Sequence, residues 1–339
     1  QVALDLNALI GELLSKGQPI HVLAHSMGGV LFREFMILGD KWKDLNAAPG
    51  FRALFLGCPL GGSYLIPETL VGRGGNITKL SLLDLKHGKK ELLEVFGACP
   101  GLYNLLPLST TPHDFGNIDS WRSLLRYSNG LGIEPSETIL KNFRKFRDRI
   151  NTSLGRDDFR NIIYVAGHSD STTATYAIES DARGGNLVFK STAEGDGSVT
   201  WASGILPVFA ENKALYYSTT IHGELANDEK LFPAFRDLLK TGQTARLRQV
   251  PPSVGQRGGR LVDKPRYEVI PVTPSNIESV VLGIPPFQEE TDVAAPVRIS
   301  IANGDLRDAR YPLVVGHFYR DGILGAEGVL DANFGGVLR

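Results

Sequence analysis

A serine lies between a short apolar strand and an apolar helix, and this junction restricts the fold more than any other stretch of the chain. Residues 19–24 predict a buried strand, residues 27–38 predict a helix, and the turn between them carries Ser26. Such a sharp turn forces the serine into a strained backbone conformation, which small residues two positions before and after it, Ala24 and Gly28, can accommodate. We therefore expect an α/β protein in which Ser26 projects beyond the end of a sheet.

Further apolar runs supply the rest of this predicted sheet. Residues 51–57, 161–166 and 214–218 predict buried strands, and the helical patterns between them imply parallel pairing. Residues 40–50 are predicted to be a polar connection. A hairpin is expected from residues 173–178 and 186–190, and an amphipathic helix from residues 228–240.

The order of polar residues along the chain suggests how Ser26 could be activated. A serine hydroxyl becomes a good nucleophile when an imidazole takes its proton and an acid orients that imidazole. Asp196, in a glycine-flanked turn, and His222, between the last strand and the closing helix, follow Ser26 in the order Ser, acid, His. Asp170, which follows the strand at 161–166, is an alternative acid, although Asp196 is favoured. The backbone N–H of Met27 is expected to stabilise an oxyanion.

Four landmarks together resemble the lecithin:cholesterol acyltransferase-like branch of α/β-hydrolases, close to bacterial lipases. They are residues 24–29, 58–63, 100–107 and 195–199, and the resemblance covers residues 1 to about 240. It implies an α/β-hydrolase fold with Ser26, Asp196 and His222 as nucleophile, acid and base. It also implies a helical cap over about 64–150 and a pocket bordered by residues 59–63, with His25, Leu60 and Gly61 as pocket candidates. The sequence departs from the family at Ala24, where glycine is usual, and at Thr200, where proline is usual.

The two ends of the chain suggest further domains. Several strands precede the serine turn in α/β-hydrolases, so residues 1–240 are interpreted as a hydrolase fragment lacking its amino-terminal strands, with more of the same polypeptide at both ends. Residues 241–265 are rich in Gly, Pro, Gln and Arg and predict a linker. Residues 266–339 predict a small, incomplete α/β domain. Its part from 297 to 339 is faintly similar to the amino-terminal domain of leucyl aminopeptidases, for which a binding or regulatory role is expected.

Composition excludes several classes of protein. The net charge of −1 provides no field for nucleic acid or an acidic membrane, and no apolar run is long enough to span a bilayer. The one basic run predicts a helix with a solvated face (Lys141, Arg144, Lys145, Arg147, Arg149). No metal or phosphate-binding motif is present, so no cofactor is expected. Cys58 and Cys99 leave the redox compartment open, and a cytoplasmic location is favoured.

These features lead to one hypothesis and one alternative. The chain is expected to be a serine esterase, lipase or acyltransferase that acts on carboxylic esters, with lipid esters favoured, through an acyl-enzyme on Ser26. The alternative is a catalytically silent, hydrolase-like scaffold or regulatory module of a larger multidomain protein.

Overall fold

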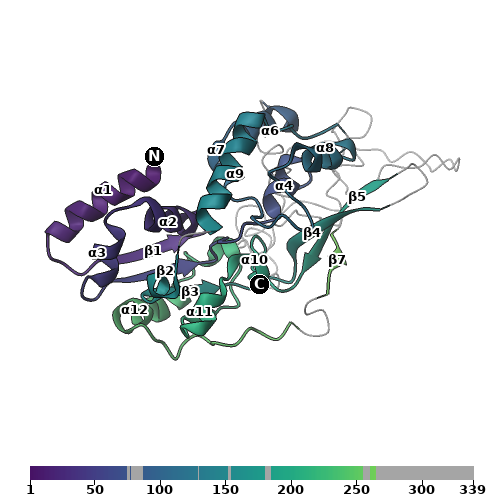
Figure 1. Ribbon diagram of the computed structural model, residues 1–339. Coiled ribbons are helices and arrows are strands. Elements are labelled where there is room, and N and C mark those ends of the chain that lie inside the picture. Colours follow the sequence, from purple (N-terminus) through teal and green to yellow (C-terminus); the bar gives the residue numbers. More distant parts are fainter. Residues whose placement is uncertain are drawn as a thin grey trace, which may run out of the picture. The chain divides into compact units, whose positions relative to one another are not determined.

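The computed structural model describes residues 1–74, 77, 87–128, 130–151, 154–179, 185–254 and 260–264. The chain divides into two units, Gln1–Val269 and Ile270–Arg339, and all described residues belong to the first. The predicted domain at 266–339, with its similarity to leucyl aminopeptidases, lies outside the described residues. The described part is a mixed helix and sheet protein (Figure 1).

A parallel sheet forms the centre of the first unit. Its order is β1 (His21–His25), β2 (Arg52–Leu56), β3 (Ile162–Ala166) and β6 (Leu215–Tyr217), and every neighbouring pair is parallel. All five residues of β3 are buried, as expected for a strand with helices on both faces of its sheet. The carboxyl ends of the four strands therefore meet at one edge, where the turns after them can converge.

Helices cover both faces of this sheet. Because successive residues of a strand point to opposite faces, neighbouring residues of β2 pack into different clusters. Phe55 packs into the cluster formed with α1 (Val2–Ser15), α2 (Met27–Leu38) and α11 (Pro207–Glu211). Its neighbours Leu54 and Leu56 pack into the cluster formed with α12 (Phe232–Thr241). Two short helices, η2 (His222–Glu224) and η3 (Glu229–Leu231), lie between β6 and α12.

The polar connection predicted at residues 40–50 contains a helix, α3 (Trp42–Ala47). Trp42 and Leu45 are 3% and 0% exposed, and Trp42 packs edge-on against Phe32 and Phe51. Two large apolar side chains in an otherwise polar segment are too few to show the periodicity that predicts a helix. Their burial against α2 nevertheless stabilises the helical turn between them.

The residues between β2 and β3 are largely helical and share a second core with the hairpin. The helices are α4 (Leu65–Leu70), α6 (Lys89–Gly97), α7 (Pro100–Tyr103), α8 (Ile118–Arg126), α9 (Glu137–Asn151) and η1 (Arg156–Phe159). The hairpin strands β4 (Thr172–Glu179) and β5 (Asn186–Thr192) are antiparallel, as predicted. Trp121, Phe143 and Tyr176 are among the residues of this core. None of the described helices is long and apolar enough to cross a membrane.

The basic run on α9 is not simply a solvated face. Arg147 is 9% exposed and forms an ion pair with Asp114, and Arg149 forms one with Glu34 of α2. Arg144 donates to the carbonyl of Gly116 at 2.7 Å. These contacts join α9 to α2 and to the loop before α8, which the helical period alone could not reveal.

Part of the segment predicted as a linker, 241–265, packs against other elements of the first unit. Val262–Asp263 forms strand β7, antiparallel to β5, and the N–H of Tyr217 in β6 donates to the carbonyl of Arg248. Leu247 packs against the cluster beneath α12. The composition of this segment predicted irregular backbone and gave no sign of β7. The strand forms because it pairs with β5, more than 70 residues earlier in the chain.

Candidate active site

Ser26 adopts the strained backbone that the sequence predicted. Its φ is 54° and its ψ is −123°, and it joins the end of β1 to the start of α2. A side chain on Gly29 would lie 2.4 Å from the sulfur of Cys58, so only glycine lets the helix approach β2 this closely. A Cβ on Gly28 would lie 3.5 Å from the Cβ of Ala24, an ordinary contact, which explains why alanine fits at position 24. Such strain persists only where the surroundings enforce it.

Three side chains from distant parts of the chain form one hydrogen-bonded series. The Nε2 atom of His222 lies 2.9 Å from Oγ of Ser26, and its Nδ1 atom lies 2.8 Å from Oδ2 of Asp196. A carboxylate only accepts hydrogen bonds, so Nδ1 carries the proton and Nε2 is free to accept from the serine hydroxyl. This tautomer is the one that can remove the proton of Ser26.

Asp196 is held by its own turn. It is 2% exposed, and its Oδ1 atom accepts the backbone N–H groups of Ser198 at 3.0 Å and Val199 at 2.7 Å. Gly57, at the end of β2, leaves room for the pair: a Cβ there would lie 2.7 Å from Oδ2 of Asp196 and 3.1 Å from Nδ1 of His222. The carboxylate therefore keeps one oxygen for the imidazole and is fixed through the other.

His222 is also fixed through its backbone. Its N–H donates to the carbonyl of Asp196 at 2.8 Å, and its own carbonyl accepts from Nε2 of His25 at 2.9 Å. The two imidazole rings lie 4.9 Å apart. His25, expected to line a pocket, thus contacts the segment that carries His222.

The alternative acid does not reach the imidazole. Asp170 is exposed, whereas Asp196 occupies Nδ1 of His222. His168, two residues earlier, has a buried Nε2 atom without a hydrogen-bond partner, and its ring lies 6.1 Å from that of Trp201. The adjacent residues His168, Ser169 and Asp170 therefore do not form a second hydrogen-bonded series of the kind that joins Ser26, His222 and Asp196.

Met27 is the first residue of α2, so its N–H belongs to the group of amides at a helix start that have no partner within the helix. These amides lie at the positive end of the helix, next to the hydroxyl of Ser26. The arrangement can stabilise an oxygen that becomes negative when Ser26 attacks.

The loop after β2 is held by hydrogen bonds to two other segments of the chain. The N–H of Gly61 donates to the carbonyl of Ser203 at 2.7 Å, and the carbonyl of Leu60 accepts from Arg33 at 2.9 Å. Both loop residues line a cavity. Thr200, the departure from proline, begins α10 (Trp201–Gly204), and its side chain caps that helix by accepting the N–H of Ser203.

The thiols take no part in the series. Cys58 and Cys99 are both free; Cys58 is fully buried, and this burial raises the pKa of its thiol well above the usual value. Within the described residues, no cluster of three or more His, Cys, Asp or Glu side chains could hold a metal ion.

Sequence reasoning missed Gly57, Gly167 and the supporting contact of His25. A Cβ on Gly167 would lie 2.9 Å from that of Asp196 and 2.4 Å from the carbonyl of Thr220. Gly57 is the last residue of one predicted strand and Gly167 directly follows another, positions that could have signalled close approach of another segment. The hydrogen bond between His25 and the carbonyl of His222 joins residues 197 positions apart, and no local sequence pattern predicts it.

Comparisons with known proteins give little guidance. No protein-family model and no curated protein matches the chain. Among solved structures, it is similar to the mature form of the Bacillus licheniformis lipase BlEst2, with 16% identity, a TM-score of 0.37, and coverage of 70% of this chain and 73% of the lipase. The propeptide form gives 16% identity and a TM-score of 0.36, covering 72% of this chain and 40% of that one. A likeness this weak carries no inference about function.

Proposed function

We propose that this chain is an α/β-hydrolase-type serine hydrolase that acts on carboxylic esters, with lipid esters as the favoured substrates. What supports the proposal above all is the series from Ser26 Oγ through His222 to Asp196, with hydrogen bonds of 2.9 and 2.8 Å, at a strained turn between strand and helix. The exposed Met27 and the half-buried Ser26 leave the hydroxyl open to a substrate.

In the first half of the proposed reaction, Oγ of Ser26 attacks the ester carbonyl while Nε2 of His222 takes the hydroxyl proton. The carbonyl oxygen becomes negative next to the N–H of Met27. Asp196 accepts from Nδ1 and stabilises the imidazolium. When the carbon–oxygen bond of the ester breaks, His222 returns its proton to the leaving alkoxide, so an alcohol departs and the acyl group remains on Ser26.

In the second half, water attacks the acyl-serine and gives a proton to His222. The bond to Oγ then breaks, the proton returns to Ser26, and a carboxylic acid is released. An alcohol in place of water would give a new ester by the same steps. Hydrolysis and acyl transfer therefore share the same series of residues and differ only in the acceptor.

An active-site-directed fluorophosphonate tests the nucleophile directly. The full chain is expected to be labelled, and Ser26→Ala is expected to abolish labelling, because a phosphonyl group is transferred to an activated serine oxygen. Ser15→Ala is the matched control: Ser15 is an exposed residue at the end of α1 and should leave labelling unchanged. Hydrolysis of p-nitrophenyl esters of short and long acyl chains then identifies the preferred substrate.

A folded wild-type chain that takes no label would favour the alternative of a silent scaffold. Equal labelling of wild type and Ser26→Ala would show that another residue is the nucleophile. Faster turnover of an amide than of the matching ester would replace the proposed esterase with a peptidase.

A further inference from the structure

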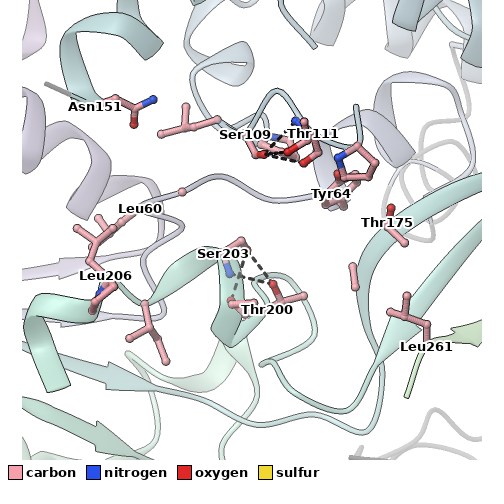
Figure 2. Close-up of a pocket in the computed structure, with 18 of the residues that line it drawn as sticks. Leu60, Tyr64, Ser109, Thr111, Asn151, Thr175, Thr200, Ser203, Leu206 and Leu261 are labelled. Carbon is pink, nitrogen blue, oxygen red and sulfur yellow. Dashed lines mark hydrogen bonds between the residues drawn. The ribbon is translucent and has the colours of Figure 1, made fainter. Parts of the chain in front are cut away.

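A cavity of about 680 Å³ lies outside the hydrogen-bonded series. It is open to solvent and is bordered by the loop after β2, residues 107–112, strand β4 and the helices α10 and α11 (Figure 2). Among the described residues, neither Ser26 nor His222 lines it. Its volume lies within the range of roughly 300–1,000 Å³ that is typical of small-molecule sites.

The walls of this cavity are mainly apolar. Leucine side chains reach it from separate segments, with Leu60 and Leu206 labelled on one side of Figure 2 and Leu261 on the other. Leu108 and Ile205 contribute further apolar surface. Such walls favour an aliphatic body over a polar one, because contact with it removes apolar surface from water.

Four of the hydroxyl groups that line the cavity bond to one another or to the backbone. Thr200 and Ser203 lie 2.9 Å apart through their hydroxyl oxygens, and Ser109 donates to the carbonyl of Thr111 at 2.6 Å (Figure 2). These four groups are thus already satisfied, which makes the lining less polar than its composition suggests.

Arg33 is the one charged side chain among the described lining residues. It is 8% exposed, and its terminal nitrogens donate to the carbonyls of Leu60 at 2.9 Å and Ile150 at 2.8 Å. Its Nε atom is buried without a hydrogen-bond partner. Arg33 forms no ion pair with any of the described carboxylates, and desolvation lowers its pKa to about 10.

The two carbonyl bonds hold Arg33 in place but do not neutralise it. Ile150 lies in the last turn of α9, whose carbonyl end carries a partial negative charge of about one half. Within the described residues, the full positive charge of Arg33 therefore remains partly uncompensated beside an apolar cavity. An anion at the wall would offset the cost of burying this guanidinium, as paired burial does elsewhere in proteins.

We propose that this cavity binds a monoanionic amphiphile, a carboxylate head at Arg33 with an aliphatic tail along the leucine-lined walls. The site makes and breaks no covalent bond, so the proposal is independent of the chemistry proposed for Ser26. A carboxylic acid released from an ester and an acid supplied from elsewhere share this chemistry.

Calorimetric titration of the full-length Ser26→Ala chain tests the two halves of the ligand separately. Decanoate is expected to bind at least about tenfold more tightly than decan-1-ol, which lacks the charge, and than butanoate, which lacks the tail. Arg33→Gln is expected to remove the preference of decanoate over decan-1-ol. Equal affinity for decanoate and decan-1-ol in the Ser26→Ala chain would overturn the assignment of an anion.

The location is tested by filling the cavity. Ala202 lines it and is exposed, so Ala202→Phe can project into the space and should weaken decanoate binding by at least about tenfold. Ala98→Phe, at an exposed position after α6, adds the same ring elsewhere and should change nothing. Decanoate binding unaffected by Ala202→Phe would overturn the site. This comparison also decides the matter if Arg33→Gln fails to fold.

Adding decanoate to the wild-type chain during ester turnover separates the two sources of the acid. If the released product is the ligand, decanoate should alter turnover of decanoyl esters, and Ala202→Phe should remove that effect. If the acid comes from elsewhere, carboxylic acids that are not products of an ester the protein hydrolyses should bind as tightly as decanoate.

Discussion

Two carboxylates of this protein are each 2% exposed, and they are stabilised in opposite ways. Asp196 accepts two backbone N–H groups within three residues of itself and bonds to the imidazole of His222. Glu68 accepts from the ammonium of Lys264 at 2.8 Å and from the hydroxyl of Thr173 at 2.6 Å. One carboxylate is therefore held by amide dipoles and the other by a full positive charge.

The difference shows which partner each carboxylate can lose. Loss of the imidazole leaves Asp196 with both amide bonds. Loss of Lys264 leaves Glu68 with one hydroxyl and, in the part of the chain that the structure describes, no counter-charge. Lys264 lies 196 residues beyond Glu68 and directly follows β7, so the second arrangement depends on a distant segment that packs against β5. We expect changes at the first carboxylate to affect activity and changes at the second to affect stability.

Asp196→Asn should have the largest effect of all. The amide oxygen can still accept the N–H groups of Ser198 and Val199, but the side chain no longer fixes the tautomer of His222. Turnover of a carboxylic ester should fall by about 10⁴-fold, while the free energy of unfolding in urea should change by less than about 1 kcal/mol. A loss of stability as large as the loss of activity would remove the contrast between the two carboxylates.

Lys264→Met should give the largest change in stability. An unpaired buried carboxylate is expected to lower the free energy of unfolding by about 3–5 kcal/mol, measured by urea denaturation. Lys240→Met, at an exposed position in α12, is the control and should change it by less than about 0.5 kcal/mol.

A second substitution sharpens this result. In the double variant Lys264→Met and Glu68→Gln, the buried charge is gone and much of the lost stability should return. If the double variant is no more stable than Lys264→Met alone, the loss comes from packing of the segment after β7 rather than from the charge on Glu68.

Gly57→Ala should have an intermediate effect on the first carboxylate. Its φ of 54° is costly for alanine, and the new methyl group would lie 2.7 Å from Oδ2 of Asp196. Ester turnover should fall by about 10- to 100-fold, because a small displacement of the Asp196–His222 pair is costly in rate. Gly17→Ala has a similar φ of 66° with nothing within 4 Å, so it reports the backbone strain alone. Equal turnover in the two variants would show that a methyl group at position 57 does not displace Asp196.

The smallest effect concerns pH and the hairpin that carries Thr173. His113 stacks on Tyr176 of β4, with ring centroids 3.7 Å apart, and burial lowers its pKa from 6.5. The unfolded chain therefore binds more protons than the folded one as the pH falls below 6.5, and this group's contribution to stability is lost in that direction. His113→Gln should make the free energy of unfolding fall less between pH 7 and pH 5. An unchanged slope would show that His113 is accessible to protons when folded.

Much of the parallel sheet follows from local patterns. Residues 51–57, 161–166 and 214–218 are apolar runs that each contain a strand of the sheet, and the run at 19–24 covers all of β1 (His21–His25) except its last residue. The turn at Ser26 is equally local, since its φ of 54° depends on the small residues around it. By contrast, α3 escaped prediction because its two buried side chains, Trp42 and Leu45, gain their stability from α2 and residue 51 rather than from a period in their own segment.

The order Ser, acid, His along the chain made Ser26 and His222 candidates, but it left Asp196 and Asp170 as alternatives for the acid. Only the tertiary structure decides which carboxylate lies on Nδ1 of His222. Asp170 follows β3 of the parallel sheet and Asp196 follows β5 of the hairpin, and their order along the chain does not say which of the two turns reaches the imidazole. The pairing of Glu68 with Lys264 is likewise beyond sequence reasoning. Local backbone preference acts over a few residues and can be read from them, whereas the partner of a buried charge is set by which distant segments the fold brings together.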